Sequence, residues 1–195
     1  MKRVFVAINL PEEIKNKIEK EEKEIKNLFP EELRETMFKW VKKENLHITL
    51  LFIGYIDEKA LPQLNLIVKK ITESFKPFSL KFEKITYGPP KIIPPRLIWL
   101  ELEKKPELLE LAQKLKEEVE KAGILNRYEK REFSPHITLV RIRTWQWKRT
   151  EPEERPEINE EINLSFKVNS IEVMESKLKR GGSEYTILEL CPLKT

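Results

Sequence analysis

The chain has two histidines, and both lie in the same tetrapeptide, His-Ile-Thr-Leu. The first copy is in "ENLHITLLFIG" (residues 44–54) and the second in "FSPHITLVRIR" (residues 133–143). Side chains at positions i and i+2 of a β-strand point to the same face, so each copy presents an imidazole and a hydroxyl side by side. The two aliphatic side chains of each copy point to the other face and can anchor the strand in a core.

Two imidazoles and two hydroxyls are suited to acid–base chemistry at a phosphodiester. An imidazole titrates near ~6.5, so one histidine of a pair can accept a proton while the other donates one. Each positioned proton transfer contributes roughly 10²–10⁴ in rate, and threonine hydroxyls can donate to phosphate oxygens as charge builds there. His47 and His136 are therefore candidate catalytic residues, and Thr49 and Thr138 are candidate phosphate ligands. This chemistry suits in-line displacement at a ribose-linked phosphate and needs no metal.

Other kinds of catalytic site find less support. A zinc site takes three or four ligands, and two histidines with a lone Cys191 and a lone Asp57 supply few. The chain has no nucleophile elbow for a Ser-His-Asp triad and no glycine-rich phosphate loop. For either tetrapeptide alone, a core strand with a satisfied histidine is the simpler interpretation. The repeat of the whole tetrapeptide favours a shared function.

Length and composition indicate a globular protein. The chain has 195 residues, of which 39% are hydrophobic and 36% charged, and its net charge is +4. The bias towards Lys and Glu is typical of proteins from hot environments, and the mild positive charge permits a polyanionic partner. Because there is one cysteine, no secretion signal and no membrane-length apolar segment, we expect a cytoplasmic protein without membrane association.

The hydrophobic pattern predicts two successive units with the same order of elements. The first unit contains a strand (3–10), a helix begun by Pro11 (12–29), the first HITL strand (45–54), a helix (58–75) and an alternating strand (78–88). The second unit contains a strand (96–103), a helix (106–123), the second HITL strand (136–143), an alternating strand (164–177) and a closing strand (183–191). Residues 144–163 interrupt this order and are predicted as a surface loop, with a mobile flap as the alternative.

This order predicts an α+β fold. We expect residues 1–195 to form a single domain of two pseudo-symmetric lobes related by an internal duplication. Two sheets, largely antiparallel, should flank a central cleft, with the helices outside. The HITL strands should lie beside the cleft, so that both histidines face it.

The paired motif resembles the signature of the two-histidine (2H) phosphoesterase superfamily, which is H-x-[T/S]-x present twice. More narrowly, the chain resembles the bacterial and archaeal RNA 2′,3′-cyclic phosphodiesterases, also known as 2′-5′ RNA ligases. The likeness spans nearly the whole chain, through "RVFVAINLPEEI", "WVKKENLHITLLFIG", "PRLIWLELE", "FSPHITLVRIR" and "SKLKRGGSEYTILELCPL".

The resemblance implies hydrolysis of RNA 2′,3′-cyclic phosphate ends to 2′-phosphomonoesters, with reversible 2′-5′ joining at the same site. It implies that His47 is the proton donor, that His136 is the proton acceptor, and that Thr49 and Thr138 hold the phosphate. RNA ends or small cyclic phosphates are the expected substrates of a monomer that needs no cofactor. The alternatives are a phosphodiesterase for a small cyclic nucleotide, an ADP-ribose cyclic phosphate or a 2′-5′ oligonucleotide, and a non-catalytic RNA-end binding module.

Arg141 matches the basic residue that this family carries just beyond the second motif. Strict alternation places its side chain on the face opposite His136 and Thr138. Either a β-bulge or the strand end turns it back towards the cleft, where it would bind the phosphate, or it contacts RNA or structure elsewhere.

Aromatic and basic side chains elsewhere supply further candidates for RNA contact. A base could stack on Trp40, Tyr87, Trp145 or Trp147. An RNA path could be lined by Lys130, Arg131 and Lys177 to Arg180, although solvated surface charge is the simpler interpretation of each.

Overall fold

The structure is a computed structural model, and it describes residues 1–125, 132–180 and 182–194. The strands are β1 (Lys2–Asn9), β2 (Phe38–Trp40), β3 (His47–Ile56), β4 (Phe78–Gly88), β5 (Leu97–Leu102), β6 (His136–Ile142), β7 (Asn159–Glu161), β8 (Ser165–Val168), β9 (Ser170–Lys179) and β10 (Gly182–Pro192). The helices are α1 (Glu12–Asn27), α2 (Glu31–Met37), α3 (Leu61–Thr72), α4 (Pro106–Lys121) and α5 (Thr144–Trp147). Short 3-10 turns form η1 (Lys43–Asn45), η2 (Glu58–Ala60) and η3 (Pro152–Glu154).

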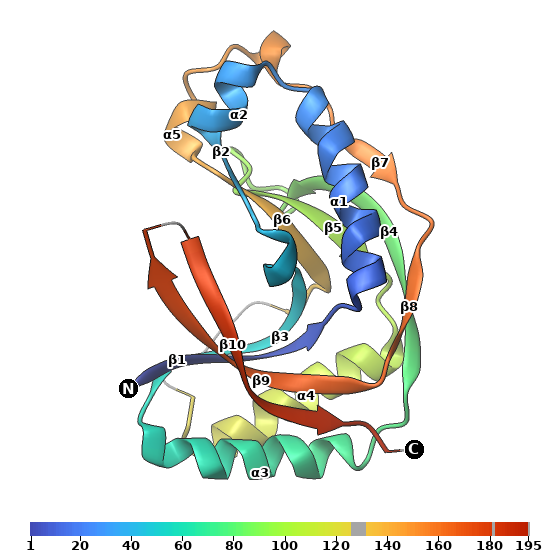
Figure 1. The fold of residues 1–195 in the computed structure, drawn as a ribbon, viewed down its shortest axis with the longest axis vertical. Helices are drawn as coiled ribbons and strands as arrows, with labels where there is room; N and C mark the ends of the chain where they lie inside the picture. The colour runs from blue at the N-terminus through green and yellow to red at the C-terminus, as the bar shows by residue number, and fades with distance from the viewer. Residues whose placement is uncertain (126–131, 181, 195) are drawn as a thin grey trace.

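The strands form one sheet in the order β10-β9-β1-β3-β6-β5-β4-β7, with β2 beside β6 and β8 beside β4. Every strand pair between described residues is antiparallel. The helices lie outside the sheet (Figure 1). The predicted α+β class with largely antiparallel strands and outer helices is confirmed, and the two expected sheets are joined into one where β3 meets β6.

The sheet order shows an exchange between the two sequence units. The alternating strand of the first unit, β4, pairs with β5 of the second unit. The alternating strand of the second unit, β9, pairs with β1 of the first. Each half of the sheet therefore contains strands from both units, an arrangement that the linear order of elements does not reveal.

Proline and glycine residues set the limits of the helices. Pro11 and Pro106 stand at the starts of α1 and α4, where a fixed φ and a missing N–H cost nothing. Gly123 ends α4 with a φ of +69°, which favours glycine, and its amide donates to the Glu120 carbonyl. Helices α3 and α4 pack on each other and against β3, β9 and β10, and the buried face of α1 joins the same main core.

Several short elements were not predicted. The connection after Pro30 forms α2 and β2, and the predicted strand 164–177 is divided at Asn169 into β8 and β9. Segment 144–163, predicted as a surface loop, contains α5, η3 and β7, and Trp147 in α5 is buried. Most residues of the segment are exposed, in line with the surface-loop prediction, but Trp147 departs from it because it packs against Tyr87 of β4, with 5.1 Å between ring centroids.

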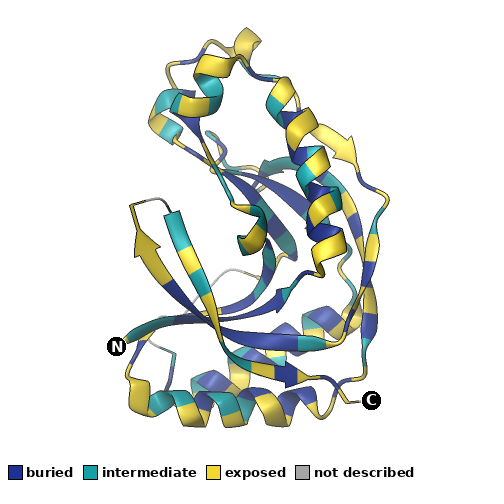
Figure 2. Ribbon diagram, in the orientation of Figure 1, coloured by how far each residue is buried: buried dark blue, intermediate teal, exposed yellow. Residues whose placement is uncertain are grey.

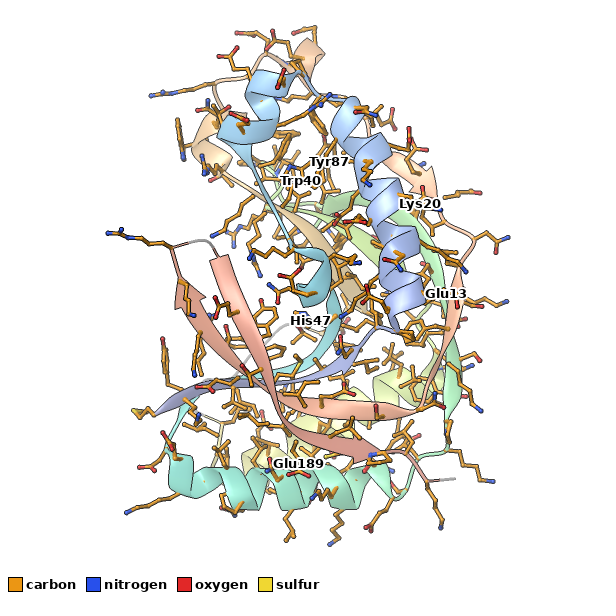
Figure 3. The ribbon with its side chains drawn as sticks, viewed as in Figure 1. Glu13, Lys20, Trp40, His47, Tyr87 and Glu189 are labelled. Atoms are coloured by element: carbon orange, nitrogen blue, oxygen red, sulfur yellow. The ribbon has the colours of Figure 1, made fainter. Side chains whose placement is uncertain are left out.

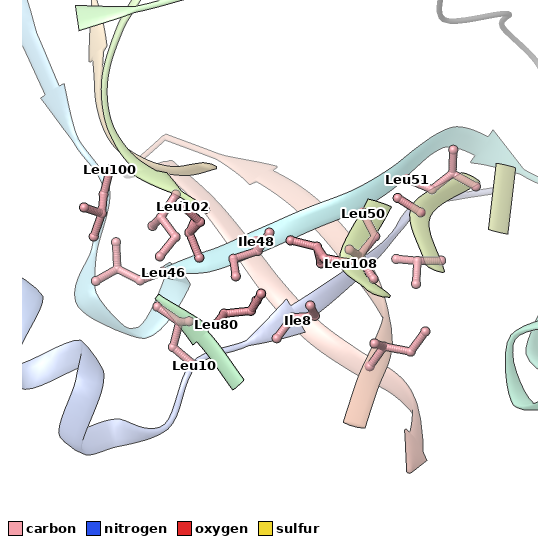
Figure 4. Packing of buried hydrophobic residues seen from close by; sticks show 14 of the residues in the cluster. Ile8, Leu10, Leu46, Ile48, Leu50, Leu51, Leu80, Leu100, Leu102 and Leu108 are labelled. Carbon is pink, nitrogen blue, oxygen red and sulfur yellow. The ribbon is translucent and has the colours of Figure 1, made fainter. Parts of the chain in front are cut away.

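The HITL strands are anchored from the face opposite their histidines. Ile48 and Ile137 are both fully buried, and Figure 4 draws Ile48 within the cluster that also holds Leu46, Leu80 and Leu102. Burial of one such side chain stabilises the fold by about 1.5–3 kcal/mol. Figure 2 shows this buried interior along the central strands, with exposed residues on the outer sides of the helices.

A single main hydrophobic core takes residues from both halves of the sheet. The single domain with duplicated lobes stays a prediction, and the matching strand registers described below support it. Among the helices that the structure describes, none combines the length and the apolar character that a membrane crossing requires.

Candidate active site

The two motifs meet at one point in the sheet. Ile48 of β3 pairs with Ile137 of β6 in antiparallel register, and each is the second residue of its HITL tetrapeptide. Extending this register by one residue places His47 across from Thr138 and places Thr49 across from His136. All four side chains then lie on the face opposite the buried isoleucines. The chain thus brings two imidazoles and two hydroxyls to one face although they are far apart in sequence.

Each motif ends in a β-bulge. In the β5–β6 register Trp99 pairs with Thr138 and Ile98 with Val140, so Leu139 is the extra residue. An extra residue reverses the alternation beyond it, and Arg141 therefore shares the face of His136 and Thr138. The bulge was one of the alternatives open for Arg141, and it is the one that the structure contains.

The first motif carries the same bulge. In the β1–β3 register Ala7 pairs with Thr49 and Val6 with Leu51, so Leu50 is the extra residue. Phe52 consequently occupies the position in β3 that Arg141 occupies in β6. The two motifs thus share a β-bulge at their fourth residue but carry different side chains beyond it.

His47 lies in a half-buried, largely aromatic environment. Its ring centroid is 5.0 Å from that of Phe5 and 5.1 Å from that of Tyr185. Its Nδ1 atom is 2.7 Å from the Asn45 carbonyl oxygen, and its Nε2 atom is 3.0 Å from Thr49 Oγ1. Burial lowers the pKa of His47 to about 4, and the positive charges of Arg141 and Lys15 act in the same direction.

His136 has a comparable backbone contact and a different neighbourhood. Its Nδ1 atom is 2.8 Å from the Ser134 carbonyl oxygen, and its ring centroid is 4.4 Å from that of Trp99. Burial lowers the pKa of His136 and Arg141 lowers it further, whereas the Ser134 carbonyl contact and, to a smaller extent, Glu101 oppose this shift.

The carbonyl contacts fix the tautomer of both rings. A carbonyl oxygen can only accept, so Nδ1 carries the hydrogen and Nε2 holds the lone pair when the ring is neutral. In both strands the carbonyl belongs to the residue two positions before the histidine. In the neutral rings both Nε2 atoms are thereby the proton acceptors, and that of His47 is engaged by the Thr49 hydroxyl.

A cavity of about 390 Å³ adjoins the motifs, between β1 and β3, the β9–β10 hairpin and the β2–η1 segment. His47, Thr49 and Arg141 contribute to its wall, whereas His136 and Thr138 are not among the described residues that line it. Figure 3 shows His47 at the base of this region with Trp40 above it. The cavity therefore extends from the His47 side of the pair.

The cavity wall is basic and aromatic. Among the described residues that line it none is acidic, whereas its cations are Arg3, Lys39, Lys42 and Arg141. Its aromatic side chains, apart from His47, are Phe5, Trp40, Phe52 and Tyr185. Such a surface suits an anionic ligand that carries a flat ring, as a nucleotide does.

The structure separates the other sequence candidates. Of the four proposed stacking residues only Trp40 is among the described residues that line the cavity. Tyr87 donates to the Pro156 carbonyl, Trp147 is buried, and Trp145 is exposed beneath Arg149. These contacts indicate that Tyr87 and Trp147 are packing residues and that Trp145 is a surface residue.

None of the described basic candidates, Lys177, Lys179 and Arg180, is among the residues that line the cavity. Lys177 and Lys179 pair with Glu175 and Glu184, which agrees with solvated surface charge. Arg180 is exposed at the end of β9. Lys130 and Arg131 lie outside the described residues.

Sequence reasoning missed the residues that surround the histidines. Phe5 and Tyr185 flank His47, whereas Trp99 and Glu101 flank His136. The available signal was alternation in the flanking strands: Phe5 and Ala7 of "RVFVAINL" share a face, as do Trp99 and Glu101 of "RLIWLELE". Which strands lie beside which motif, however, depends on the sheet order.

Among the residues that the structure describes, no three His, Cys, Asp or Glu side chains form a cluster suited to a metal ion.

Known proteins resemble this chain along most of its length. A relative from Archaeoglobus fulgidus named RNA 2′,3′-cyclic phosphodiesterase is 31% identical over 179 residues, which cover 92% of this chain and 90% of the relative. A Bacillus subtilis protein of the same name is 36% identical over 138 residues, covering 70% and 69% of the two chains. A Methanocaldococcus jannaschii protein of that name is 30% identical and covers 96% of this chain and 98% of its own.

Solved structures share the fold. A crystal structure of a Thermus thermophilus protein superposes with a TM-score of 0.79 at 28% identity and covers 98% of each chain. Escherichia coli LigT in complex with 3′-AMP gives a TM-score of 0.77 at 27% identity, over 100% of this chain and 99% of LigT. The family described as the 2′-5′ RNA ligase superfamily matches residues 14–180. The fold, the relatives and this match agree with the resemblance carried by the paired HITL motifs, and the chain belongs to the 2′-5′ RNA ligase superfamily.

Proposed function

We propose that the protein opens 2′,3′-cyclic phosphate ends of RNA to 2′-phosphomonoesters by general acid–base catalysis, and that the same site reversibly joins RNA ends through a 2′-5′ linkage when an RNA 5′-hydroxyl takes the place of water. The relatives named RNA 2′,3′-cyclic phosphodiesterase support the reaction. The observation that carries the proposal is the Ile48–Ile137 register, which sets both histidines on one face of the sheet.

In the proposed reaction His136 is the proton acceptor and His47 is the proton donor. A water molecule gives a proton to His136 Nε2 while its oxygen forms a bond to phosphorus. The bond from phosphorus to the 3′ oxygen breaks, and His47 Nε2 gives its proton to that oxygen. The phosphate stays on the 2′ oxygen, and solvent restores the two rings.

Thr49, Thr138 and Arg141 are proposed to bind the phosphate. Their register and the bulge at the last residue of the second motif put them on the face of the histidines. Hydroxyl and guanidinium donors preorganised around the non-bridging oxygens stabilise the charge that develops there.

The pKa of His47 bears on its role as donor. Because burial lowers this pKa to about 4, His47 is neutral at pH 7 in the free protein. A bound phosphate anion beside the ring favours the imidazolium form and raises the pKa. A donor with a low pKa is also the stronger acid, so the few protonated molecules transfer their proton readily.

A defined RNA with a cyclic phosphate end tests the proposal. The wild-type protein in EDTA should give the 2′-phosphomonoester, which phosphorus NMR distinguishes from the 3′ isomer. His47→Ala and His136→Ala should each lower the rate by roughly 10²–10⁴ while leaving the circular dichroism spectrum unchanged. Full activity in either variant would contradict the proposed site, and a strict need for a divalent cation would contradict the metal-independent reaction.

Competition assays identify the preferred substrate. We infer that an RNA end is preferred because the cavity offers several cations and aromatic rings beyond the reacting centre. The same assay should include a small 2′,3′-cyclic nucleotide, an ADP-ribose cyclic phosphate and a 2′-5′ oligonucleotide. Tight binding of RNA ends with no product after long incubation would instead indicate a non-catalytic binding module.

A further inference from the structure

The matching registers reveal a difference between the two histidines. Glu101 lies across from His136 in the β5–β6 register, and at the corresponding position of the β1–β3 register Asn9 lies across from His47. Side chains of directly opposed residues share a face, with their Cβ atoms about 5 Å apart. One histidine therefore has a carboxylate as its cross-strand neighbour, and the other has an amide.

Trp99 holds this carboxylate beside His136. The indole Nε1–H donates to Glu101 Oε1 over 3.2 Å, and the indole ring lies 4.4 Å from the imidazole ring, inclined at 41°. Trp99 is 3% exposed. A Cβ atom at Gly88 of β4 would overlap its six-membered ring, so the glycine provides the space that the indole fills. At the position of Trp99, β1 carries Ala7 and has no such support for Asn9.

The charged groups around the two rings differ accordingly. His136 faces Glu101 from β5, Arg141 from β6 and His47 from β3. Of these described groups, Glu101 alone favours the imidazolium form of His136. His47 faces Arg141, Lys15 of α1 and His136, which all disfavour its imidazolium form.

We propose that Glu101, held by the Trp99 indole, is a positioning residue that stabilises the imidazolium of His136 once that ring has taken a proton from water. This inference rests on the proposed function. It gives the two chemically identical HITL motifs distinct roles: the ring with the carboxylate is the better acceptor, and the ring without one is the better donor. Glu101 acts through His136 and has no contact with the reacting atoms.

An alternative is that Glu101 serves only as an acceptor for the buried indole. That structural role predicts a loss of stability on substitution and no specific effect on either imidazole. The two histidines give two separate imidazole signals, so a titration followed by NMR can tell the roles apart.

The test compares 13C-labelled histidine signals in wild-type protein, Glu101→Gln and Glu24→Gln across a pH series. His136→Asn assigns the two signals. Glu101→Gln should shift the pKa of His136 downward, because the imidazolium loses its neighbouring carboxylate, and change that of His47 much less. Glu24→Gln removes the same charge from the exposed face of α1 and should change neither. An unchanged pKa of His136 in Glu101→Gln would overturn the proposal.

Trp99→Phe supplies a second variant. Phenylalanine keeps an aromatic ring against His136 but cannot donate to Glu101, so the pKa of His136 should again fall. If it stays at the wild-type value, the indole does not hold the carboxylate in place and that part of the proposal is wrong.

Kinetics complete the test. Glu101→Gln should lower kcat by roughly three- to tenfold with little change in KM, because Glu101 does not contact the phosphate. A rise in KM at unchanged kcat would contradict the positioning role. If the wild-type protein does not open cyclic phosphates at all, the proposed function fails, whereas the NMR titration still decides whether Glu101 supports His136.

Discussion

His47 Nε2 lies 3.0 Å from Thr49 Oγ1, so the first HITL motif is closed on itself in the free protein. Because the Asn45 carbonyl holds the hydrogen on Nδ1, the threonine hydroxyl donates to the lone pair of the neutral ring. A phosphate that accepts a hydrogen bond from the Thr49 hydroxyl must displace His47 Nε2 from it. In the proposed reaction, this contact would therefore link phosphate binding to the release of His47 Nε2 for proton transfer.

Substitution of Thr49 tests this link. Thr49→Val removes the hydroxyl and should lower kcat/KM on the order of 10², and it should raise the pKa of His47 because the neutral ring loses its donor. Thr49→Ser keeps the hydroxyl and is the matched control, with activity near that of the wild type. Equal activities of the Val and Ser variants would show that the hydroxyl has no part in the reaction.

Substitution of Arg141 tests the bulge. Arg141→Gln removes a phosphate donor and should lower kcat/KM by roughly 10–10³. Since the positive charge of Arg141 lowers the pKa of both histidines, its removal should raise both values. Arg149→Gln removes a like charge above Trp145, away from the cavity, and should leave activity and both titrations unchanged. If Arg141→Gln had the same kcat/KM as the wild type, Arg141 would not bind the phosphate.

The pH dependence of kcat/KM should be bell-shaped, with its maximum on the acid side of the ordinary histidine pKa near ~6.5. The working form carries one proton on the pair, and both free-protein pKa values are lowered, that of His47 to about 4. As pH rises above the higher of the two, this form is lost and the rate should fall tenfold per pH unit. The two inflections belong to the coupled pair. A flat profile between pH 6 and 8 would contradict the assignment.

The sequence was sufficient to predict most of the fold because its signals are local. Pro106 and Gly123 bound the clearest helix, and strict alternation over 78–88 predicted β4 at its observed limits. The short helix α5 within residues 144–163 was not predicted because the burial of Trp147 depends on its contact with Tyr87, which is 60 positions away by number. A contact of that kind leaves no periodicity in the segment itself.

The candidate site could be predicted to the extent that its motif repeats. Two HITL copies mark His47 and His136 as candidates, but nothing local indicates that an extra residue at Leu139 turns Arg141 to their face. The exchange of β4 and β9 between the halves is equally hidden. Tyr185 next to His47 is a consequence of that exchange, since β10 reaches the first motif only through β9 and β1.

Lys15 should affect the orientation and the pKa of His47 without contacting its ring. This lysine of α1 is 6% exposed, and its Nζ donates to the Glu44 carbonyl over 3.0 Å. Glu44 precedes Asn45, whose carbonyl orients the His47 ring. Lys15→Met keeps the length of the side chain but leaves a carbonyl without its donor, which should lower the free energy of unfolding by about 1–3 kcal/mol.

The same variant should change catalysis through His47 alone. Because the charge of Lys15 lowers the pKa of His47, Lys15→Met should move the His47 signal to a higher pKa in the NMR titration and leave that of His136 nearly unchanged. Looser support of the ring should lower kcat/KM by roughly tenfold. Lys20→Met makes the same replacement on the exposed face of α1 and should match the wild type in both measurements. If Lys15→Met also matches the wild type, the backbone of η1 holds His47 without help from α1.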